Sequence, residues 1–407
     1  MRFKVLDGSK IAIYMLFLNW YVVSVFRGAL ISGISTILYG IAVLCFLRDL
    51  MITQGGRLQF SREEWYWLIY GLLSLLTVVF AQSQSQAISG LVDYAKRFFL
   101  IVCTVYICKQ ERSIKFPIHL LTIVALGCAI GSLSHVQDIT RRLSLTTGVS
   151  ISINDVGSIM AFGVFAVGLF WHNTNVRAPI EIGTKITAYI VLISTIFISG
   201  SRKAFIAIVI YLVLFILLGA GRISSSFDRR RTIISVAAIS IAAIVVIRYL
   251  FPMMDETSLY DRLFGDRAEG ALSSDESRWE LYVLAFKDFL KYPVFGLGYN
   301  NYDYVHGNYS HSTYAEPLAC SGILSLFYLM PYLFIFMKQI KLLKRWQKYD
   351  NRASSIQKGF FAFYIAFIFI GAGIPFLYKD VPCIVLAMLV AWQGLCFEEI
   401  HEGKIII

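Results

Sequence analysis

Apolar segments of about twenty residues follow one another along most of the chain, and each is long enough to cross the hydrocarbon core of a bilayer. Hydrophobic pattern and length place twelve of them, at 9–26, 29–47, 64–82, 93–108, 116–134, 153–171, 184–200, 203–220, 232–250, 317–337, 358–373 and 378–396. The fourth is the least apolar, because Asp93, Lys96 and Arg97 lie at its start. The sequence therefore predicts an all-α, polytopic integral membrane protein with about 12 transmembrane helices, forming a single domain over residues 1–407.

The composition is typical of this class of protein. Of the 407 residues, 57% are hydrophobic and 15% are charged, and the mean hydropathy is +0.66. Lys and Arg in cytoplasmic loops account for the formal net charge of +11, so we expect no nucleic-acid partner. The seven cysteines lie in or beside apolar segments without the paired spacing of a metal site, and we expect buried free thiols.

The distribution of Lys and Arg between alternate loops predicts the orientation. With the N-terminus inside, the inner loops collect Arg48, Arg57, Arg62, Lys109, Arg112, Lys115, Arg222, Arg229, Arg230, Arg231, Lys338, Lys341, Lys344, Arg345, Lys348, Arg352 and Lys358. The outer connections apart from the long loop hold only Arg27, Arg141, Arg142, Arg202, Lys203 and Lys379. Short loops rich in Lys and Arg stay cytoplasmic, so both termini are predicted inside. The first span is expected to be retained, because no small-residue cleavage site follows it.

One long polar segment, residues 251–316, separates the ninth span from the tenth and is predicted to face outward. Its last part, from Gly296 to Glu316, is dense in Tyr, Asn, Gly and His. Side chains of these types do not build a hydrophobic core, but they form a surface that stacks on and hydrogen-bonds a polar ligand. We therefore predict that this extracytoplasmic loop covers the active site of a membrane enzyme.

An amphipathic helix is predicted inside the loop. Ser273-x-x-Glu276 has the pattern of a capping box at a helix N-terminus. Apolar side chains then recur at helical spacing over 279–290, and Pro293 ends the run. The helix is expected either to lie on the outer membrane surface or to pack across the bundle of spans. The Gly-x-Gly segment at 296–298 allows a tight turn and a close backbone approach.

A short turn that contains Arg202 and Lys203 joins the seventh span to the eighth on the outer side. Charged groups at the membrane edge are costly unless they are paired or reach water. The pair can simply extend its charges to the interface from a helix end. Alternatively, Arg202 forms an anion clamp, because a guanidinium offers a planar fork of donors that matches phosphate oxygens.

Arg278 offers the same two interpretations. It lies in the first turn of the predicted helix beside Glu276 and Glu280, where a helical ion pair contributes a few tenths of a kcal/mol. The same place, near the positive end of a helix, also favours a bound phosphate.

His311 is the main candidate for a general base. Imidazole has a reference pKa near 6.5 and accepts a proton at neutral pH. A lone histidine is more often structural, but this one stands among Tyr309, Ser312, Tyr314 and Glu316, just before a span. Glu316 is the rival base, and His306 is a weaker one.

Metal and nucleotide chemistry have no support in the sequence. The chain lacks Asp-x-Asp and His-x-x-His spacings, and its outer acidic residues do not cluster. It also lacks Gly-x-x-x-x-Gly-Lys-Ser/Thr and Gly-x-Gly-x-x-Gly. We expect no cofactor.

Together these residues resemble the O-antigen ligase and repeat-unit polymerase family of bacterial membrane glycosyltransferases. The resemblance rests on about twelve spans, on the turn Gly200-Ser201-Arg202, and on one long outer loop that carries Arg278, Gly296–Gly298 and His311-Ser312-Thr313-Tyr314. Family members often have Asn where this chain has Ser312. The specific motifs lie between about Ile198 and Phe327, whereas the similarity in topology covers the whole chain. It implies a GT-C-like membrane fold in the cytoplasmic (inner) membrane.

The resemblance also implies a reaction. The donor sugar is carried on a polyprenyl diphosphate, such as an undecaprenyl-diphosphate-linked oligosaccharide, in the outer leaflet, and an acceptor hydroxyl attacks its anomeric carbon. This chemistry needs positive charge for the leaving diphosphate and a base for the hydroxyl. Arg202 and Arg278 are assigned to the diphosphate and His311, or else Glu316, to the acceptor. The remaining assigned substrate-binding residues are Lys203, Asn300, Tyr302, Tyr309 and Tyr314.

Three functions remain open at this stage. A polymerase of O-antigen, capsule or exopolysaccharide would join two lipid-linked repeat units, with a flippase and a chain-length regulator as partners. A ligase would transfer the glycan to a lipid core or a protein. We favour a polymerase, because the compact outer region offers no platform for a large acceptor. A lipid-linked oligosaccharide transporter is the third possibility, although mid-span charges are few and no inverted repeat is visible.

Overall fold

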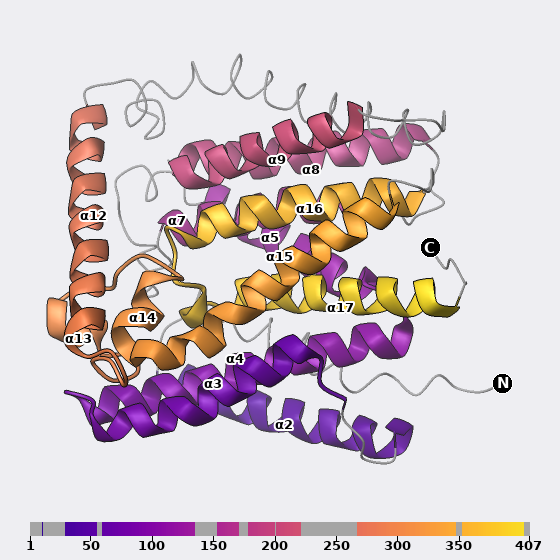
Figure 1. Ribbon diagram of the computed structural model, residues 1–407. Helices are drawn as coiled ribbons and strands as arrows, with labels where there is room; N and C mark the ends of the chain where they lie inside the picture. The colour runs from indigo at the N-terminus through magenta and orange to yellow at the C-terminus, as the bar shows by residue number, and fades with distance from the viewer. Residues whose placement is uncertain are drawn as a thin grey trace.

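The computed structural model describes Lys10 and residues 29–54, 59–134, 153–170, 178–199, 201–220, 267–346 and 352–402 (Figure 1). In this part of the chain every regular element is a helix. The α-helices are α2 (Ala29–Gln54), α3 (Arg62–Val79), α4 (Gln84–Glu111), α5 (Lys115–Ser134), α7 (Ile153–Phe170), α8 (Ala178–Ser199), α9 (Arg202–Ala220), α12 (Arg267–Lys291), α13 (Tyr302–His306), α14 (Ala315–Ser321), α15 (Leu326–Trp346), α16 (Arg352–Gly371) and α17 (Asp380–Glu402). Two 3₁₀ turns, η3 (Gly322–Ser325) and η4 (Phe376–Tyr378), complete them.

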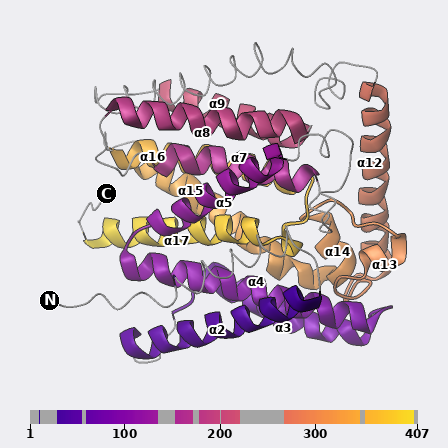
Figure 2. The same cartoon turned by 180° about the vertical axis from the view of Figure 1, so that it is seen from behind.

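Most of the long helices lie side by side with their axes in roughly one direction (Figures 1 and 2). A continuous series of packed neighbours runs from α3 through α4, α17 and α15 to α16. Helix α9 joins α16 to α7 and α8, and α5 packs against both of these. Their facing sides form one hydrophobic core, in which helix α17 is buried over most of its length. The helices therefore form a single bundle with two ends, and the candidate residues gather at one of them.

Three helical stretches are long and apolar enough to cross a membrane, namely Lys115–Ser132, Ala315–Arg345 and Asp380–Phe397. Shorter apolar helices cover Asp155–Leu169, Gly183–Ser199 and Ile356–Gly371. The all-helical, apolar character of the described residues fits a membrane protein. The number of twelve spans stays a prediction, since the segment 9–26 apart from Lys10, the segment 232–250 and both chain ends lie outside the described residues.

One predicted boundary is wrong, and one predicted span, although present within Ala315–Arg345, is not a continuous helix. The fourth span was expected from Asp93, but α4 already begins after Ser83, whose hydroxyl caps the helix by accepting a hydrogen bond from the Gln86 amide. The tenth was expected as one helix over 317–337. The chain instead breaks at Gly322, which has a φ of +56°, into α14, η3 and α15.

Helix α12 runs across the bundle end, roughly perpendicular to the other long helices (Figures 1 and 2). This position agrees with the second of the two predicted alternatives, packing across the bundle, and the Tyr282 hydroxyl donates a 2.5 Å hydrogen bond to the Ala372 carbonyl beyond α16. The helix ends at Lys291, shortly before Pro293, as predicted. The predicted capping box is wrong, because α12 runs from Arg267 and Ser273 lies inside it.

The Gly-x-Gly segment after α12 makes the predicted close approach. Gly296 and Gly298 have φ values of +65° and +95°, which side chains other than glycine rarely adopt. A Cβ on Gly296 would collide with the backbone of Cys320, and one on Gly298 with Ala81. These contacts hold the returning chain against α14 and the end of α3.

Candidate functional site

The loop that carries His311 is folded around one carboxylate. Ser310 donates two hydrogen bonds to Glu316 Oε2, from its backbone amide at 2.8 Å and from its hydroxyl at 2.7 Å. The Glu316 side chain is buried, and so is Ser310. Glu316 thereby closes the loop across six residues, and this contact fixes the path of the chain around His311.

The same loop is attached to the connection between α16 and α17. The Thr313 amide donates to the Gly371 carbonyl at 2.8 Å, and its hydroxyl donates to the Ile374 carbonyl at 2.5 Å. That hydroxyl also accepts a hydrogen bond from the Phe376 amide at 2.9 Å. The Tyr314 hydroxyl donates to the Ile368 carbonyl at 2.8 Å. Because these hydrogen bonds join the loop to residues far away in the sequence, tertiary contacts rather than local backbone preferences determine the position of the loop.

His311 itself is half-buried and has a φ of +59°, in the left-handed region. Histidine tolerates this conformation better than most residues, and such positions are kept where the surroundings determine the backbone. The Tyr309 ring lies against the imidazole, with 4.0 Å between ring centroids. The imidazole is therefore held in place on one side while remaining partly accessible.

Two cationic side chains act on His311. Burial, together with the positive charges of Arg278 and Lys203, lowers the pKa of His311 to about 4. The Lys203 amine donates a 3.0 Å hydrogen bond to the Gly373 carbonyl, where any side chain on residue 373 would collide with it. Arg278 comes from α12 and Lys203 from α9, so the end of the bundle brings together charges that are 75 residues apart.

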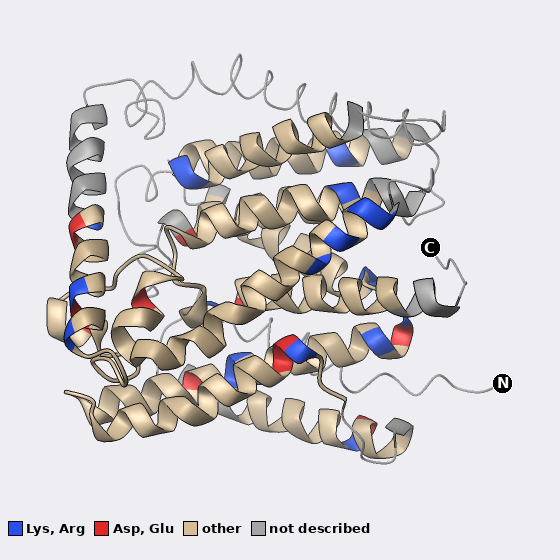
Figure 3. Ribbon diagram, in the orientation of Figure 1, with Lys and Arg blue, Asp and Glu red and all other residues tan. Residues whose placement is uncertain are grey.

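The N-terminus of α9 adds to the positive potential. Helix α9 begins at Arg202, has Lys203 next and has no acidic residue in its first turn (Figure 3). A helix N-terminus carries a partial positive charge that acidic side chains usually offset. In α7 and α17 this role falls to Asp155 and Asp380. The start of α9 is thus suited to an anionic ligand.

Two ion pairs at this end of the bundle were not predicted. The Lys379 amine lies 2.7 Å from Asp155 Oδ2, and Asp155 also acts electrostatically on Tyr309. Arg97 in α4 lies 3.1 Å from Asp380 Oδ1. The only signal in the sequence was the presence of Lys379 and Arg97 in apolar surroundings. No local pattern identifies partners more than 200 residues away.

Some predicted site residues do not reach the cluster formed by Lys203, Arg278, Tyr309 and His311. Tyr302 is fully buried and donates a 2.6 Å hydrogen bond to the Leu281 carbonyl, so its ring is not open to a sugar. His306 Nε2 lies 2.6 Å from Asp288 Oδ2, which joins α13 to α12. Asn300 has a φ of +57° and contacts the Gln86 carbonyl at 3.5 Å. Tyr314 is half-buried, and its hydroxyl is engaged with α16 as described above.

Acidic and thiol side chains do not gather at the cluster. Across the described residues, no group of three or more His, Cys, Asp or Glu side chains could hold a metal ion. Glu316 is engaged by Ser310, and Asp155 is engaged by Lys379. What the described cluster offers is two positive charges, one imidazole and one aromatic ring beside a helix N-terminus. It is suited to binding an anion and to accepting a proton nearby.

One comparison with known protein families gives a match that includes this part of the chain. Residues 187–330 match the family model described as O-Antigen ligase. A comparison with curated proteins found no match. The matched segment begins inside α8, includes α9 and α12, and ends inside α15, so it contains all nine candidate residues. Residues 187–330 of this apolar, helical membrane protein are thus similar to the O-antigen ligase family.

Proposed function

We propose that the protein is a glycosyltransferase that joins polyprenyl-diphosphate-linked oligosaccharides at the outer face of the cytoplasmic membrane. The observation that carries the proposal is the convergence of Lys203 and Arg278 on His311 at one end of the helix bundle. Glycosyl transfer from a lipid diphosphate needs cations for the leaving group and a base for the attacking hydroxyl. The O-antigen ligase match supports the same class of reaction.

In the proposed reaction the acceptor hydroxyl oxygen forms a bond to the anomeric carbon, and the bond from that carbon to the diphosphate oxygen breaks. The diphosphate lipid departs with the electron pair, and its added negative charge is met by Arg278, Lys203 and the start of α9 with Arg202. Interactions that strengthen as this charge develops accelerate the step, whereas equal binding of substrate and transition state would not. Configuration at the anomeric carbon inverts if the step is a single displacement.

We assign the hydroxyl proton to His311. With a pKa lowered to about 4, its imidazole is neutral near pH 7 and has a free lone pair. Glu316 is the weaker candidate, because its Oε2 already accepts two hydrogen bonds and its side chain is buried. Tyr309 lies beside the imidazole, where its ring can stack on a sugar.

We place this bundle end outside the cell. Basic residues concentrate at the opposite end, for example Lys344 and Arg345 in the last turn of α15 (Figure 3). Lys and Arg of short loops stay cytoplasmic, which favours this orientation. Polyprenyl-linked oligosaccharides in the outer leaflet would then meet the cluster directly.

A polymerase is the first choice among the family activities. The described outer part consists of α12, the short helices α13 and α14, and their connections, with no extra platform for a bulky lipid core or protein acceptor. In a polymerase the acceptor is a second lipid-linked repeat unit, which lies in the same leaflet as the donor. A flippase and a chain-length regulator are the expected partners.

Reconstitution tests this proposal. Purified protein in liposomes that contain one polyprenyl-diphosphate oligosaccharide should convert it to a ladder of joined oligosaccharides, without nucleotide and in the presence of EDTA. Arg278→Gln should weaken donor binding, because it removes charge-assisted hydrogen bonds of about 1.5–3 kcal/mol. Lys287→Gln on the same helix is the control for the loss of one positive charge. Movement of the lipid between leaflets without any joined product would make the protein a transporter and overturn the proposal.

A further inference from the structure

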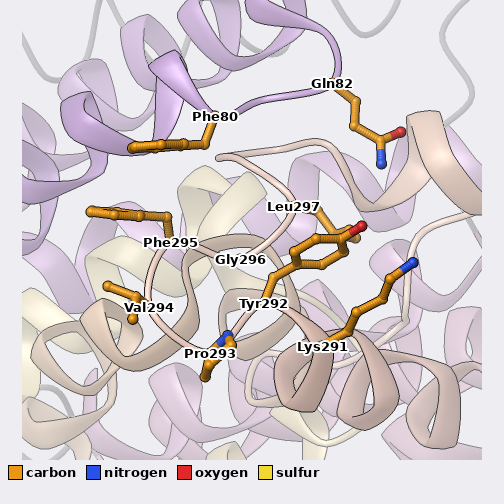
Figure 4. A pocket seen from close by; sticks show the side chains of 9 residues that line it. All are labelled: Phe80, Gln82, Lys291, Tyr292, Pro293, Val294, Phe295, Gly296 and Leu297. Carbon is orange, nitrogen blue, oxygen red and sulfur yellow. The ribbon is translucent and has the colours of Figure 1, made fainter.

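A ligand-sized cavity lies at the C-terminal end of α12 (Figure 4). It has a volume of about 390 Å³ and lies between the end of α3 and the turn that follows α12. Its lining residues are Phe80, Gln82, Lys291, Tyr292, Pro293, Val294, Phe295, Gly296 and Leu297. We call it the α3–α12 pocket. Its volume is within the range of cavities that hold small ligands.

The pocket has an apolar side and a polar side. The rings of Phe80 and Phe295 stack with centroids 4.4 Å apart and form one wall with Val294 (Figure 4). On the other side the ends of Gln82, Tyr292 and Lys291 are grouped (Figure 4). The Lys291 amine lies 5.1 Å from the centre of the Tyr292 ring. A ligand that fits both sides is amphiphilic and carries negative charge at its polar end.

The apolar wall continues into an exposed apolar surface. Helix α3 and its C-cap residue expose a row of large apolar side chains that ends at the pocket, namely Leu72, Leu75, Leu76, Val79 and Phe80. Beyond the break at Gly322, Ile323 and Leu326 are also exposed, and the Ile323 amide donates a 2.7 Å hydrogen bond to the Pro293 carbonyl. In a bilayer such rows contact hydrocarbon chains. A lipid chain can therefore enter the pocket sideways from the membrane.

Hydrogen bonds of the backbone hold the turn that lines the α3–α12 pocket in place. The Gly296 amide donates to the Tyr292 carbonyl at 3.0 Å, and the Leu297 amide donates to the Ala319 carbonyl at 2.9 Å. Two residues later, the Tyr299 amide donates to Thr77 Oγ1 at 3.0 Å. These bonds attach the turn to α14 and α3, so the cavity is present before any ligand binds.

We propose that the α3–α12 pocket binds the isoprenoid phosphate end of the acceptor, a second lipid-linked oligosaccharide. The inference rests on the proposed function, which requires two such substrates in one leaflet. Lys291 contacts the phosphate and the apolar wall holds the first isoprene units. Thirteen residues of α12 separate Arg278 from Lys291, which is about 20 Å at 1.5 Å per residue. The saccharide of the acceptor spans this distance and presents its far hydroxyl to His311.

This geometry sets a minimum length for the acceptor. A lipid-linked monosaccharide held at Lys291 cannot reach His311, whereas a saccharide of several residues can. Short acceptors should therefore fail although they occupy the pocket. A donor, whose diphosphate binds at Arg278 and Lys203 directly, has no such requirement.

The first test measures binding without turnover. Wild-type protein in nanodiscs is labelled with a photoreactive polyprenyl monophosphate, and the labelled peptides are identified by mass spectrometry. Labelling of residues 291–297 that falls at least 5-fold in Val294→Trp, which fills the cavity, supports the pocket. Leu72→Trp, on the lipid-facing row but outside the pocket, should retain the label. Absence of label from 291–297, or equal displacement by phosphatidylglycerol, overturns the inference.

The second test separates acceptor from donor in the joining reaction. Val294→Trp and Lys291→Gln should raise the KM for the acceptor about 10-fold, with an unchanged Kd for the donor. Two results would contradict the pocket assignment without affecting the proposed function. One is an equal increase in the acceptor KM and the donor Kd, and the other is an unchanged acceptor KM in a variant that joins oligosaccharides normally. Failure of the wild-type protein to join oligosaccharides would instead contradict the proposed function, and the labelling result would stand independently.

Discussion

Ser310 and Glu316 are joined by two hydrogen bonds that converge on a single carboxylate oxygen, one from the amide and one from the hydroxyl of Ser310. The pair closes the loop that holds His311 in a left-handed conformation. A buried carboxylate with this arrangement has a structural reason to be present. The roles of Glu316 and His311 can therefore be separated by substitution.

Glu316→Gln should keep near-normal turnover, because the amide oxygen can accept the same two hydrogen bonds. Glu316→Ala should lose most activity and lower the melting temperature, because it leaves two donors of Ser310 buried without an acceptor, at a cost of about 1–3 kcal/mol each. Turnover and thermal unfolding of the purified variants measure both effects. A dead but fully stable Glu316→Gln protein would make Glu316 the base.

The pH dependence of the reaction should show the lowered pKa of His311. The free enzyme loses activity only when the imidazole is protonated, so the acid limb of kcat/KM should lie near pH 4 to 5, well below 6.5. A bound diphosphate offsets Arg278 and Lys203, so the limb of kcat should lie at higher pH.

Arg278→Gln should move the limb of kcat/KM upward, since it removes a charge that lowers the pKa, and Lys287→Gln should leave it in place. The lowered pKa of His311 also makes the stability of the folded protein depend on pH. A histidine whose pKa is lower in the folded state makes the protein progressively less stable as the pH falls from about 6.5 to about 4. Below about 4 both states are protonated, and the loss of stability is complete and no longer changes with pH. An acid limb near 6.5 that does not respond to Arg278→Gln would contradict this environment for His311.

The order of the helices was predictable from the sequence, whereas several features of the site were not. Apolar length placed α3, α5, α7 and α9 to within a few residues, because burial in lipid or core requires a continuous apolar run. The Gly-x-Gly turn and the end of α12 before Pro293 were also predictable, since glycine and proline act locally.

The sequence pattern did not predict which side chains pair with each other across the helix bundle. The contacts of Lys379 with Asp155 and of Arg97 with Asp380 join distant residues, and no periodicity reports them. The burial of Tyr302 was missed for a related reason, because a tyrosine in a polar stretch has the same sequence signal whether it faces the ligand or the core. The resemblance had assigned Lys203, Arg278 and His311 to one site, but the sequence pattern alone did not show that both positive charges act on the imidazole.

Two glycines with similar backbone conformations should respond differently to alanine. Gly298 has a φ of +95° and its Cβ would collide with Ala81, whereas Gly307 has a φ of +71° and open space around it. Gly307→Ala should cost only backbone strain of roughly 1–2 kcal/mol. Gly298→Ala should add a collision that displaces α3 or the turn. Melting temperatures in detergent compare them, and equal losses would contradict the packing at Ala81.

The orientation can be tested by labelling single cysteines. Asn308 and Lys344 are both exposed. Asn308 follows α13 and Lys344 lies in the last turn of α15, and these two segments are at opposite ends of the bundle (Figure 1). In a background without the native cysteines, Asn308→Cys should react with an impermeant thiol reagent in intact cells or spheroplasts, and Lys344→Cys should react only after lysis. The reverse pattern would place the His311 cluster in the cytoplasm, away from an outer-leaflet substrate.

The most direct test of the account compares two histidines in a single-turnover transfer assay with purified protein and a polyprenyl-diphosphate oligosaccharide. His311→Asn suits the left-handed backbone, because asparagine tolerates it where alanine is strained. His306→Asn is the matched control, since His306 pairs with Asp288 instead. The account predicts that His311→Asn slows transfer by about 10²–10⁴-fold with an unchanged donor Kd, while His306→Asn transfers at nearly the wild-type rate. Near-normal transfer by a folded His311→Asn protein would contradict the central role of this site.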